Sequence, residues 1–260
     1  MDKLIGVAGC GRMGAGMLAN LKRAGIPAKG YDIRPVPGVG SDVQHFCDRL
    51  TVLISVVRDA AETDALLFDD QAVINHASQL HTIMICSTLS PNYVKGLRDR
   101  VPNRITLIDA PMSGAQVRAD AGTLTFMTGG NIEPVTDLLN AMGQTTHHMG
   151  AYGAGMTAKV LNNLLAASNT AMTRLVLDWA DANGVAESAL LDLIASASGQ
   201  NWFASGFNNI EFARDGYAPD NSIGILVKDV AAALDIGPND DTSLPKLVQS
   251  SLRQLAPRPR

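Results

Sequence analysis

Short runs of consecutive apolar residues alternate with helical patterns along the first half of the chain. Strands are predicted at residues 4–8, 28–31, 51–57, 82–86, 105–108, 124–127 and 146–149. Apolar side chains at consecutive positions suit parallel strands that are buried on both faces of a sheet. Met13, Met17 and Leu21 recur at helical spacing after the first run, and helices are also predicted at residues 92–100 and 132–142. This alternation predicts a doubly wound α/β domain.

The pattern changes near residue 150. Residues 154–183 contain no proline and a single glycine, so we expect one long helix that ends at Asn183-Gly184. Shorter helical patterns follow at residues 187–197, 222–235 and 244–255, and no strand is evident. The chain is therefore predicted to form two domains, 1–151 and 152–260, of which the second is all-helical.

Composition and charge narrow the classes of partner. Apolar residues make up 46% of the chain and charged residues 18%, which is typical of a globular protein. The net charge of −4 gives no basic surface for nucleic acid, and no apolar run is long enough to cross a bilayer. Cys10, Cys47 and Cys86 are scattered and lack metal spacing, which indicates reduced thiols. We expect a cytoplasmic protein with no metal, membrane or nucleic-acid partner.

A glycine loop follows the first predicted strand and opens the first helix. The string Gly9-Cys10-Gly11-Arg12-Met13-Gly14 matches the dinucleotide-binding pattern G-x-G-x-x-G. Its first glycine allows a tight turn, the second lets the backbone approach a pyrophosphate, and the third lets helix and strand pack closely. Glycine clusters also form ordinary turns, but the strand before and the helix after favour a cofactor. We expect Gly9, Gly11, Arg12, Met13 and Gly14 to bind it.

An acidic residue ends the second strand of the same unit. Asp32 lies 18 residues after Gly14, where a carboxylate binds the adenine ribose 2′-hydroxyl. A strand-end cap is the structural alternative for Asp32. Arg34 lies two residues further on and could accept a 2′-phosphate, in a direction that the sequence leaves open. NAD is therefore predicted as the cofactor, with NADP as the alternative.

Four further strings distinguish a family. They are Ser87-Thr88-Leu89-Ser90-Pro91, Asp109-Ala110-Pro111-Met112-Ser113-Gly114-Ala115, Gly153-Ala154-Gly155-Met156-Thr157-Ala158-Lys159-Val160-Leu161-Asn162-Asn163, and Lys228-Asp229-Val230. With the glycine loop, this set resembles the β-hydroxyacid dehydrogenases, which include 3-hydroxyisobutyrate dehydrogenase and tartronate semialdehyde reductase. The resemblance runs from Ile5 to around Leu255.

The resemblance implies a Rossmann-like domain followed by a helical domain, with the active site in the cleft between them, and a homodimer or homotetramer. It implies hydride transfer between NAD(P) and a small 3-hydroxy acid. Carried over position by position, it makes Lys159 the catalytic lysine and gives the substrate carboxylate to Ser113 and Gly114. It further implies that Asn163 positions the substrate, and that Thr88 and Lys228 approach the nicotinamide.

The residues themselves support part of this assignment. Lys159 and Asn163 are four positions apart and share one helix face, which carries little other charge before Arg174. Burial there would lower the pKa of the lysine towards neutrality, as a general acid or base requires. The structural alternatives are a solvated lysine for Lys159, an ordinary turn for Ser113-Gly114, and an exposed lysine paired with an acid for Lys228.

Two other functions stay open, namely oxidative decarboxylation of a 6-phosphogluconate-like acid and a non-catalytic NAD(P)-binding module. The lack of a histidine between Lys159 and Asn163 counts against the decarboxylation, because that branch of the family carries one there. The presence of Lys159 counts against the non-catalytic module, whose known members have lost this lysine. The chain also departs from the family pattern. Ala115 replaces a glycine, residues 35–50 form a shortened segment in which a helix is reduced or lost, and the basic C-terminal tail ends early and is expected to fray.

Overall fold

The computed structural model describes residues 3–238 and 242–259. Its contacts divide the chain into two compact units, Met1–Lys159 and Val160–Arg260, and the division falls inside the long helix α8 (Ala154–Ala182). The domain boundary at 151/152 stays a prediction. Within the described residues, no helix has the length and apolarity that crossing a bilayer requires.

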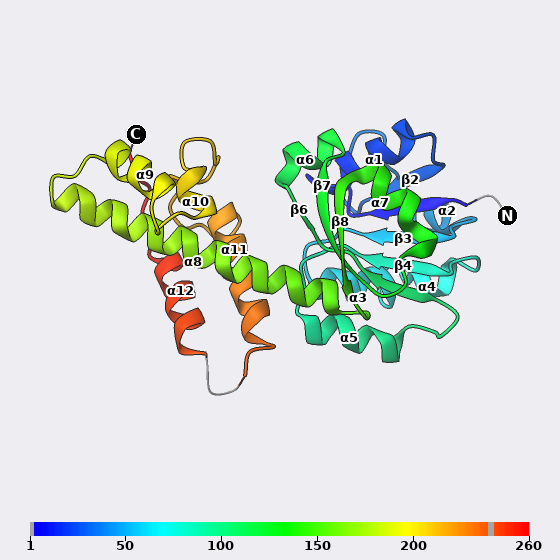
Figure 1. Cartoon of the computed structure of the whole chain (residues 1–260). Helices are drawn as coiled ribbons and strands as arrows, with labels where there is room; N and C mark the ends of the chain where they lie inside the picture. Colours follow the sequence, from blue (N-terminus) through cyan, green and yellow to red (C-terminus); the bar gives the residue numbers. More distant parts are fainter. Residues whose placement is uncertain (1–2, 239–241, 260) are drawn as a thin grey trace. The chain divides into compact units, whose positions relative to one another are not determined.

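The first unit is built on one mixed sheet of eight strands (Figure 1). The strands are β1 (Ile5–Ala8), β2 (Ala28–Tyr31), β3 (Val52–Ser55), β4 (Thr82–Ile85), β5 (Thr106–Asp109), β6 (Met112–Ser113), β7 (Leu124–Gly129) and β8 (Gly143–Gly150). Their order is β2-β1-β3-β4-β5-β7-β6, with β8 also paired to β7. β1 to β5 are parallel, whereas β7 runs antiparallel to β5 and β6. All seven predicted strands are present, and only β6 was missed.

Helices cover both faces of this sheet (Figure 1). One face packs against α1 (Gly14–Arg23), α6 (Ala115–Ala121) and α7 (Thr136–Met142), and the other against α2 (Val43–Cys47), α3 (Ala60–Leu67), α4 (Val73–His76) and α5 (Pro91–Arg100). Neighbouring strand residues enter opposite cores: Leu53 joins one cluster, and Val52 and Ile54 join the other. This two-sided burial explains the consecutive apolar runs. Residues 35–50 hold only the five-residue α2, as their shortness predicted.

The second unit is helical, as predicted, with no strand among its described residues. After α8 come α9 (Glu187–Ser196), α10 (Trp202–Ser205), α11 (Ser222–Leu234) and α12 (Ser243–Arg253). One apolar core joins α8 to α11 and α12, and a second joins α8 to α9 and α10. α8 ends at Ala182, two residues before Gly184, whose φ of 74° suits the left-handed turn that the sequence predicted there.

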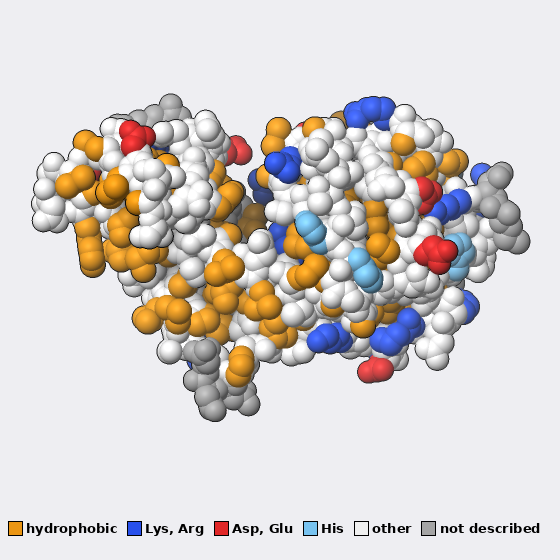
Figure 2. Space-filling view, in the orientation of Figure 1, with side chains coloured by type: hydrophobic (Ala, Val, Ile, Leu, Met, Phe, Trp, Pro, Cys, Tyr) orange, Lys and Arg blue, Asp and Glu red, His pale blue; other side chains and the backbone are white. Residues whose placement is uncertain are grey.

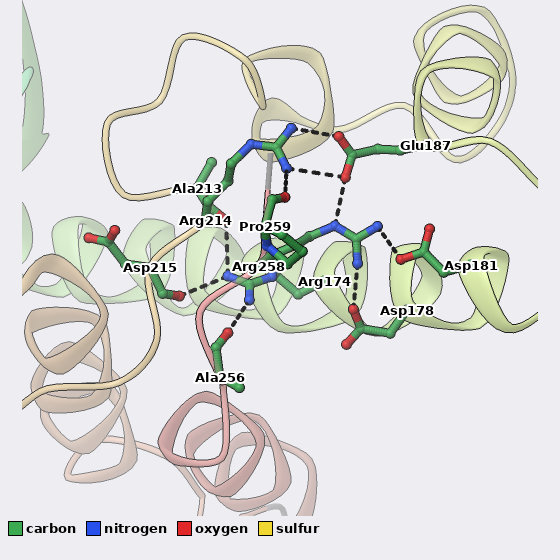
Figure 3. Close-up of polar contacts among 10 residues, drawn as sticks. All are labelled: Arg174, Asp178, Asp181, Glu187, Ala213, Arg214, Asp215, Ala256, Arg258 and Pro259. Atoms are coloured by element: carbon green, nitrogen blue, oxygen red, sulfur yellow. Dashed lines mark hydrogen bonds and ion pairs between the residues drawn. The ribbon is translucent and has the colours of Figure 1, made fainter.

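The expectation of a frayed C-terminal tail was wrong for residues 256–259, which we call the C-terminal segment (Figure 3). The side chain of Arg258 is only 7% exposed and forms ion pairs of 2.6 Å with Asp178, Asp181 and Glu187. Arg260 lies outside the described residues. A basic tail frays when its charges are solvated, but here one guanidinium is shared by three carboxylates.

A second arginine binds the backbone of the same segment (Figure 3). Arg174 of α8 is buried and donates to the carbonyl oxygens of Ala213 (3.0 Å), Asp215 (2.8 Å) and Ala256 (2.5 Å). Arg258 N–H also donates to Arg214 O at 2.8 Å. The C-terminal segment is therefore fixed to α8 by backbone contacts as well as by charge.

We expect Arg258→Gln to lower the free energy of unfolding by about 2 kcal/mol, because the substitution removes three charge-assisted hydrogen bonds from a mostly buried group. Urea denaturation followed by circular dichroism measures the change. Arg253→Gln is the matched control, since Arg253 is exposed on α12. Equal stabilities of the two variants would show that the ion pairs contribute nothing.

The same cluster gives a pH dependence. Burial acts to raise the pKa of Glu187, but hydrogen bonds from Arg214 and Arg258 outweigh it and lower the pKa below its ordinary value. This carboxylate therefore adds stability above the ordinary glutamate pKa of about 4.3, and the contribution is lost as pH falls through the lower folded-state pKa. Wild type should lose more stability than Arg258→Gln over that acid range.

Candidate active site

The glycine loop joins β1 to α1 and is shaped by close contacts at two of its glycines. Gly9 has a φ of 88°, and a Cβ there would lie 2.6 Å from Val56 O. A Cβ on Gly14 would collide with the carbonyl oxygen of Gly9. At Gly11 a Cβ would meet only the guanidinium of Arg34, 3.5 Å away, among the described residues. The middle glycine thus leaves the backbone open on the side where a pyrophosphate would bind.

The start of α1 completes this phosphate-binding geometry. Met13, at the N-cap, makes no side-chain cap hydrogen bond. The helix N-terminus can therefore offer N–H groups and its positive dipole end to phosphate oxygens. Arg12 lies exposed beside it, and Met13 is partly buried. These residues are compatible with a dinucleotide cofactor, and their assignment to it stays a prediction.

Asp32 follows β2 and is buried. Its Oδ1 accepts hydrogen bonds from Arg34 N (2.9 Å) and Arg34 Nε (3.3 Å). Its Oδ2 is buried and accepts no hydrogen bond from the residues that the structure describes. Buried carboxylate oxygens are normally paired, so this oxygen fits a ribose hydroxyl that donates to it. The direction of Arg34, which the sequence left open, is back towards Asp32 and the glycine loop.

The predicted substrate and nicotinamide residues of the first unit follow strands. Thr88 comes after β4 and is partly buried, Ser113 ends β6, and Gly114 has a φ of 137° before α6. Ala115 has a φ of 53°, in the left-handed region, which costs a residue with a Cβ about 1 kcal/mol. The departure from the family's glycine at this position is therefore accompanied by local strain.

Asp109, for which the sequence suggested no role, connects the sheet to α8. From the end of β5, its Oδ1 accepts from Gly153 N at 2.7 Å and its Oδ2 from Met156 N at 2.5 Å. Burial raises the pKa of this carboxyl, against the effect of the hydrogen bonds. The sequence feature that could have pointed to Asp109 is an acidic residue at the end of a buried apolar strand. On the helix that Asp109 caps, Lys159 is 7% exposed, and its predicted burial is confirmed.

In the second unit, the structure joins Asn163 to a residue that sequence reasoning missed. Asn163 Nδ2 donates to Asp229 Oδ2 at 2.6 Å, and Lys228 Nζ lies 3.3 Å from Asp229 Oδ1. Asp229 is a buried acid on the otherwise apolar face of α11. An acidic residue among the apolar positions of that helical pattern is the sequence feature that could have pointed to it. Lys228 is half-exposed and ion-paired, so its placement near a cofactor stays a prediction.

Two models of known protein families match this chain and together span most of its length. A family model for the NAD-binding domain of 6-phosphogluconate dehydrogenase matches residues 4–150. A second, for the NAD-binding domain of NADP-dependent 3-hydroxyisobutyrate dehydrogenase, matches residues 153–256. The chain belongs to the β-hydroxyacid dehydrogenase family. The predicted fold, NAD(P) cofactor and dehydrogenase chemistry of this family are thereby confirmed, and the two alternative functions are not favoured.

Individual relatives span nearly the whole chain. An NAD-dependent L-serine dehydrogenase of Pseudomonas aeruginosa is 30% identical over 94% of this chain and 88% of its own length. An L-threonate dehydrogenase of Cupriavidus necator is 29% identical over 94% and 87%. The structure of a Mycobacterium tuberculosis 3-hydroxyisobutyrate dehydrogenase with L-serine superposes with a TM-score of 0.76, at 25% identity, over 97% of this chain and 92% of that one.

Proposed function

We propose that this dehydrogenase oxidises the 3-hydroxyl group of a small hydroxylated carboxylic acid, or reduces the corresponding carbonyl. The observation that carries the proposal is Lys159, a nearly buried lysine one helical turn before Asn163 on α8. The relatives support it, since L-serine, L-threonate and 3-hydroxyisobutyrate all combine a carboxylate with a hydroxyl group on carbon 3.

The residues divide the work of the reaction. Ser113 and Gly114 hold the substrate carboxylate, and Asn163 positions the hydroxyl group. Lys159 accepts the hydroxyl proton at Nζ during oxidation and returns it during reduction. The nicotinamide, when bound, accepts or supplies the hydride. Thr88 and Lys228 approach the nicotinamide end, while Gly9, Gly11, Arg12, Met13, Gly14 and Asp32 hold the rest of the cofactor.

We also propose that the protein acts in the cytoplasm as a homodimer or homotetramer. Its three cysteines are buried and free, which suits a reducing compartment. One face of α8 exposes a stripe of large apolar side chains, and apolar side chains also gather on the second unit in Figure 2. The stripe consists of Leu161, Leu165, Met172, Leu175 and Trp179. Such a contiguous patch is typical of a surface that another chain covers.

Wild-type protein should turn over at least one of L-serine, L-threonate and 3-hydroxyisobutyrate with NAD or NADP. Lys159→Ala should lower kcat by about 10²-fold or more, the usual loss for a general acid or base. NAD affinity, measured by fluorescence quenching, should stay the same because the lysine is not assigned to the cofactor. Lys246→Ala, an exposed helical lysine, is the control. Near-wild-type kcat in Lys159→Ala would remove this residue from the mechanism.

The carboxylate of Asp32 attracts the 2′-hydroxyl of NAD and repels the 2′-phosphate of NADP. We expect kcat/KM for NAD to exceed that for NADP by about tenfold, which requires only ~1.4 kcal/mol. Asp32→Ala should shrink the preference, because it frees Arg34 to pair with the 2′-phosphate. The double variant Asp32→Ala/Arg34→Ala should lose the gain for NADP. Equal use of both cofactors by wild type would contradict the assignment.

Light scattering at micromolar protein concentration should give a mass of at least twice the 27.4 kDa of one chain. Leu165→Glu/Trp179→Glu should shift the protein towards monomer, because each charge would be buried in the apolar contact. Val117→Glu, which changes an exposed apolar residue of α6 in the first unit, should leave the mass unchanged. A monomeric wild type would rule out the proposed assembly.

A further inference from the structure

We propose that Arg34 binds the pyrophosphate of the cofactor, and that Asp32 holds its guanidinium group beside the glycine loop for this purpose. The inference rests on the proposed function, in which Arg34 meets the cofactor only after Asp32 is removed. It begins from the position of the guanidinium group. Arg34 Nη2 lies 3.5 Å from the point where a Cβ on Gly11 would stand. Among the described residues outside the immediate neighbours of Gly11, no other atom lies within 4 Å of that point.

That point lies on the side of the loop from which phosphate oxygens approach. The middle glycine of a G-x-G-x-x-G loop lacks a side chain so that the pyrophosphate can come close to the backbone. The helix that follows, α1, has 10 residues and an N-terminus without a side-chain cap. Independently, Asp32 Oδ2 is buried and accepts no hydrogen bond from the described residues, which indicates that a ligand group binds here.

Two hydrogen bonds turn Arg34 back towards the loop. Asp32 Oδ1 accepts from Arg34 N at 2.9 Å and from Arg34 Nε at 3.3 Å. Within the part of the chain that the structure describes, Arg34 makes no other side-chain hydrogen bond or ion pair. Both terminal NH₂ groups, Nη1 and Nη2, are therefore left for a ligand. A planar guanidinium group with two such NH₂ groups matches two phosphate oxygens at once.

The charges around the loop explain why a cation is needed at this place. The side chain of Asp32 is only 3% exposed, so water screens its negative charge weakly. The cofactor site needs that carboxylate for the ribose hydroxyl, but the same charge repels the adjacent pyrophosphate. Arg34 lies between the carboxylate and the loop and offsets this repulsion. The N-terminus of α1 alone supplies only about half an elementary charge.

Because the pyrophosphate is common to NAD and NADP, this role does not distinguish the two cofactors. In the wild type, Asp32 both holds the guanidinium group and repels a 2′-phosphate. Removal of Asp32 would release the arginine, which is the basis of the predicted gain for NADP. Arg34 thus serves the pyrophosphate while Asp32 is present and the 2′-phosphate when Asp32 is absent.

Fluorescence titration with NADH and NADPH tests the inference without any turnover. We expect Arg34→Gln to raise both dissociation constants by about tenfold, the value of one hydrogen bond to a charged group. Arg104→Gln, which removes the same charge from an exposed residue between α5 and β5, is the matched control. It should leave both constants within about twofold of wild type, because a distant exposed charge is screened by salt.

Fragments of the cofactor locate the contact. ADP-ribose contains the pyrophosphate, whereas adenosine contains no phosphate. In displacement of bound NADH, Arg34→Gln should weaken ADP-ribose by about tenfold as well, and adenosine by less than about twofold. Equal losses for both fragments would show that Arg34 acts on the adenosine or on the fold of the loop, and would overturn the inference. A loss for NADPH alone, or an unchanged affinity for NADH, would overturn it too.

The outcomes for this inference and for the proposed function are distinguishable, because binding is measured apart from catalysis. A wild type that binds NADH but turns over none of L-serine, L-threonate and 3-hydroxyisobutyrate contradicts the proposed function, while the effect of Arg34→Gln on binding still decides this inference. An active wild type whose affinity for NADH does not depend on Arg34 contradicts only the pyrophosphate role.

Discussion

The hydrogen bonds of Asp109 with the start of α8 are the contact on which the placement of Lys159 depends. Two bonds from main-chain N–H groups to a buried carboxylate contribute roughly 1.5–3 kcal/mol each, a large share of the stability of a typical domain. Close approach requires small neighbours. A Cβ on Gly129 would collide with Asp109, and one on Gly155 would lie 2.5 Å from Met127 O. With the first turn fixed in this way, helical geometry places Lys159 on the next turn.

Much of the first unit could be predicted from the sequence, because its strands are buried on both faces and its loop has a distinctive glycine pattern. β2 lies at its predicted residues, 28–31, although it is only four residues long. β6 and α6 were missed for a physical reason. β6 has only two residues, α6 buries only Ala119, and the turn between them depends on backbone angles at Gly114 and Ala115 that no periodicity reveals.

Contacts between distant residues are a second kind of feature that sequence reasoning missed. Arg258 pairs with residues 71 to 80 positions earlier, and Asn163 with one 66 positions later. A helical pattern reports which face of each helix is apolar, but it does not report which polar side chain on another helix comes within reach. The family motif pointed to Asn163 and Lys228. Only the structure shows that Asp229 contacts both of these side chains.

The arrangement of Asp32 and Arg34 also bears on how such an enzyme evolves. A codon for aspartate becomes one for asparagine, glycine or alanine by a single base change, and the arginine that suits a phosphorylated ribose is already beside it. No earlier mutation is needed to supply a cation for the 2′-phosphate before Asp32 changes. In most cells the NAD pool is kept largely oxidised and the NADP pool largely reduced. Under the proposed roles of Asp32 and Arg34, a lineage can therefore move from one pool to the other by a change at Asp32 while Lys159 and Asn163 stay untouched.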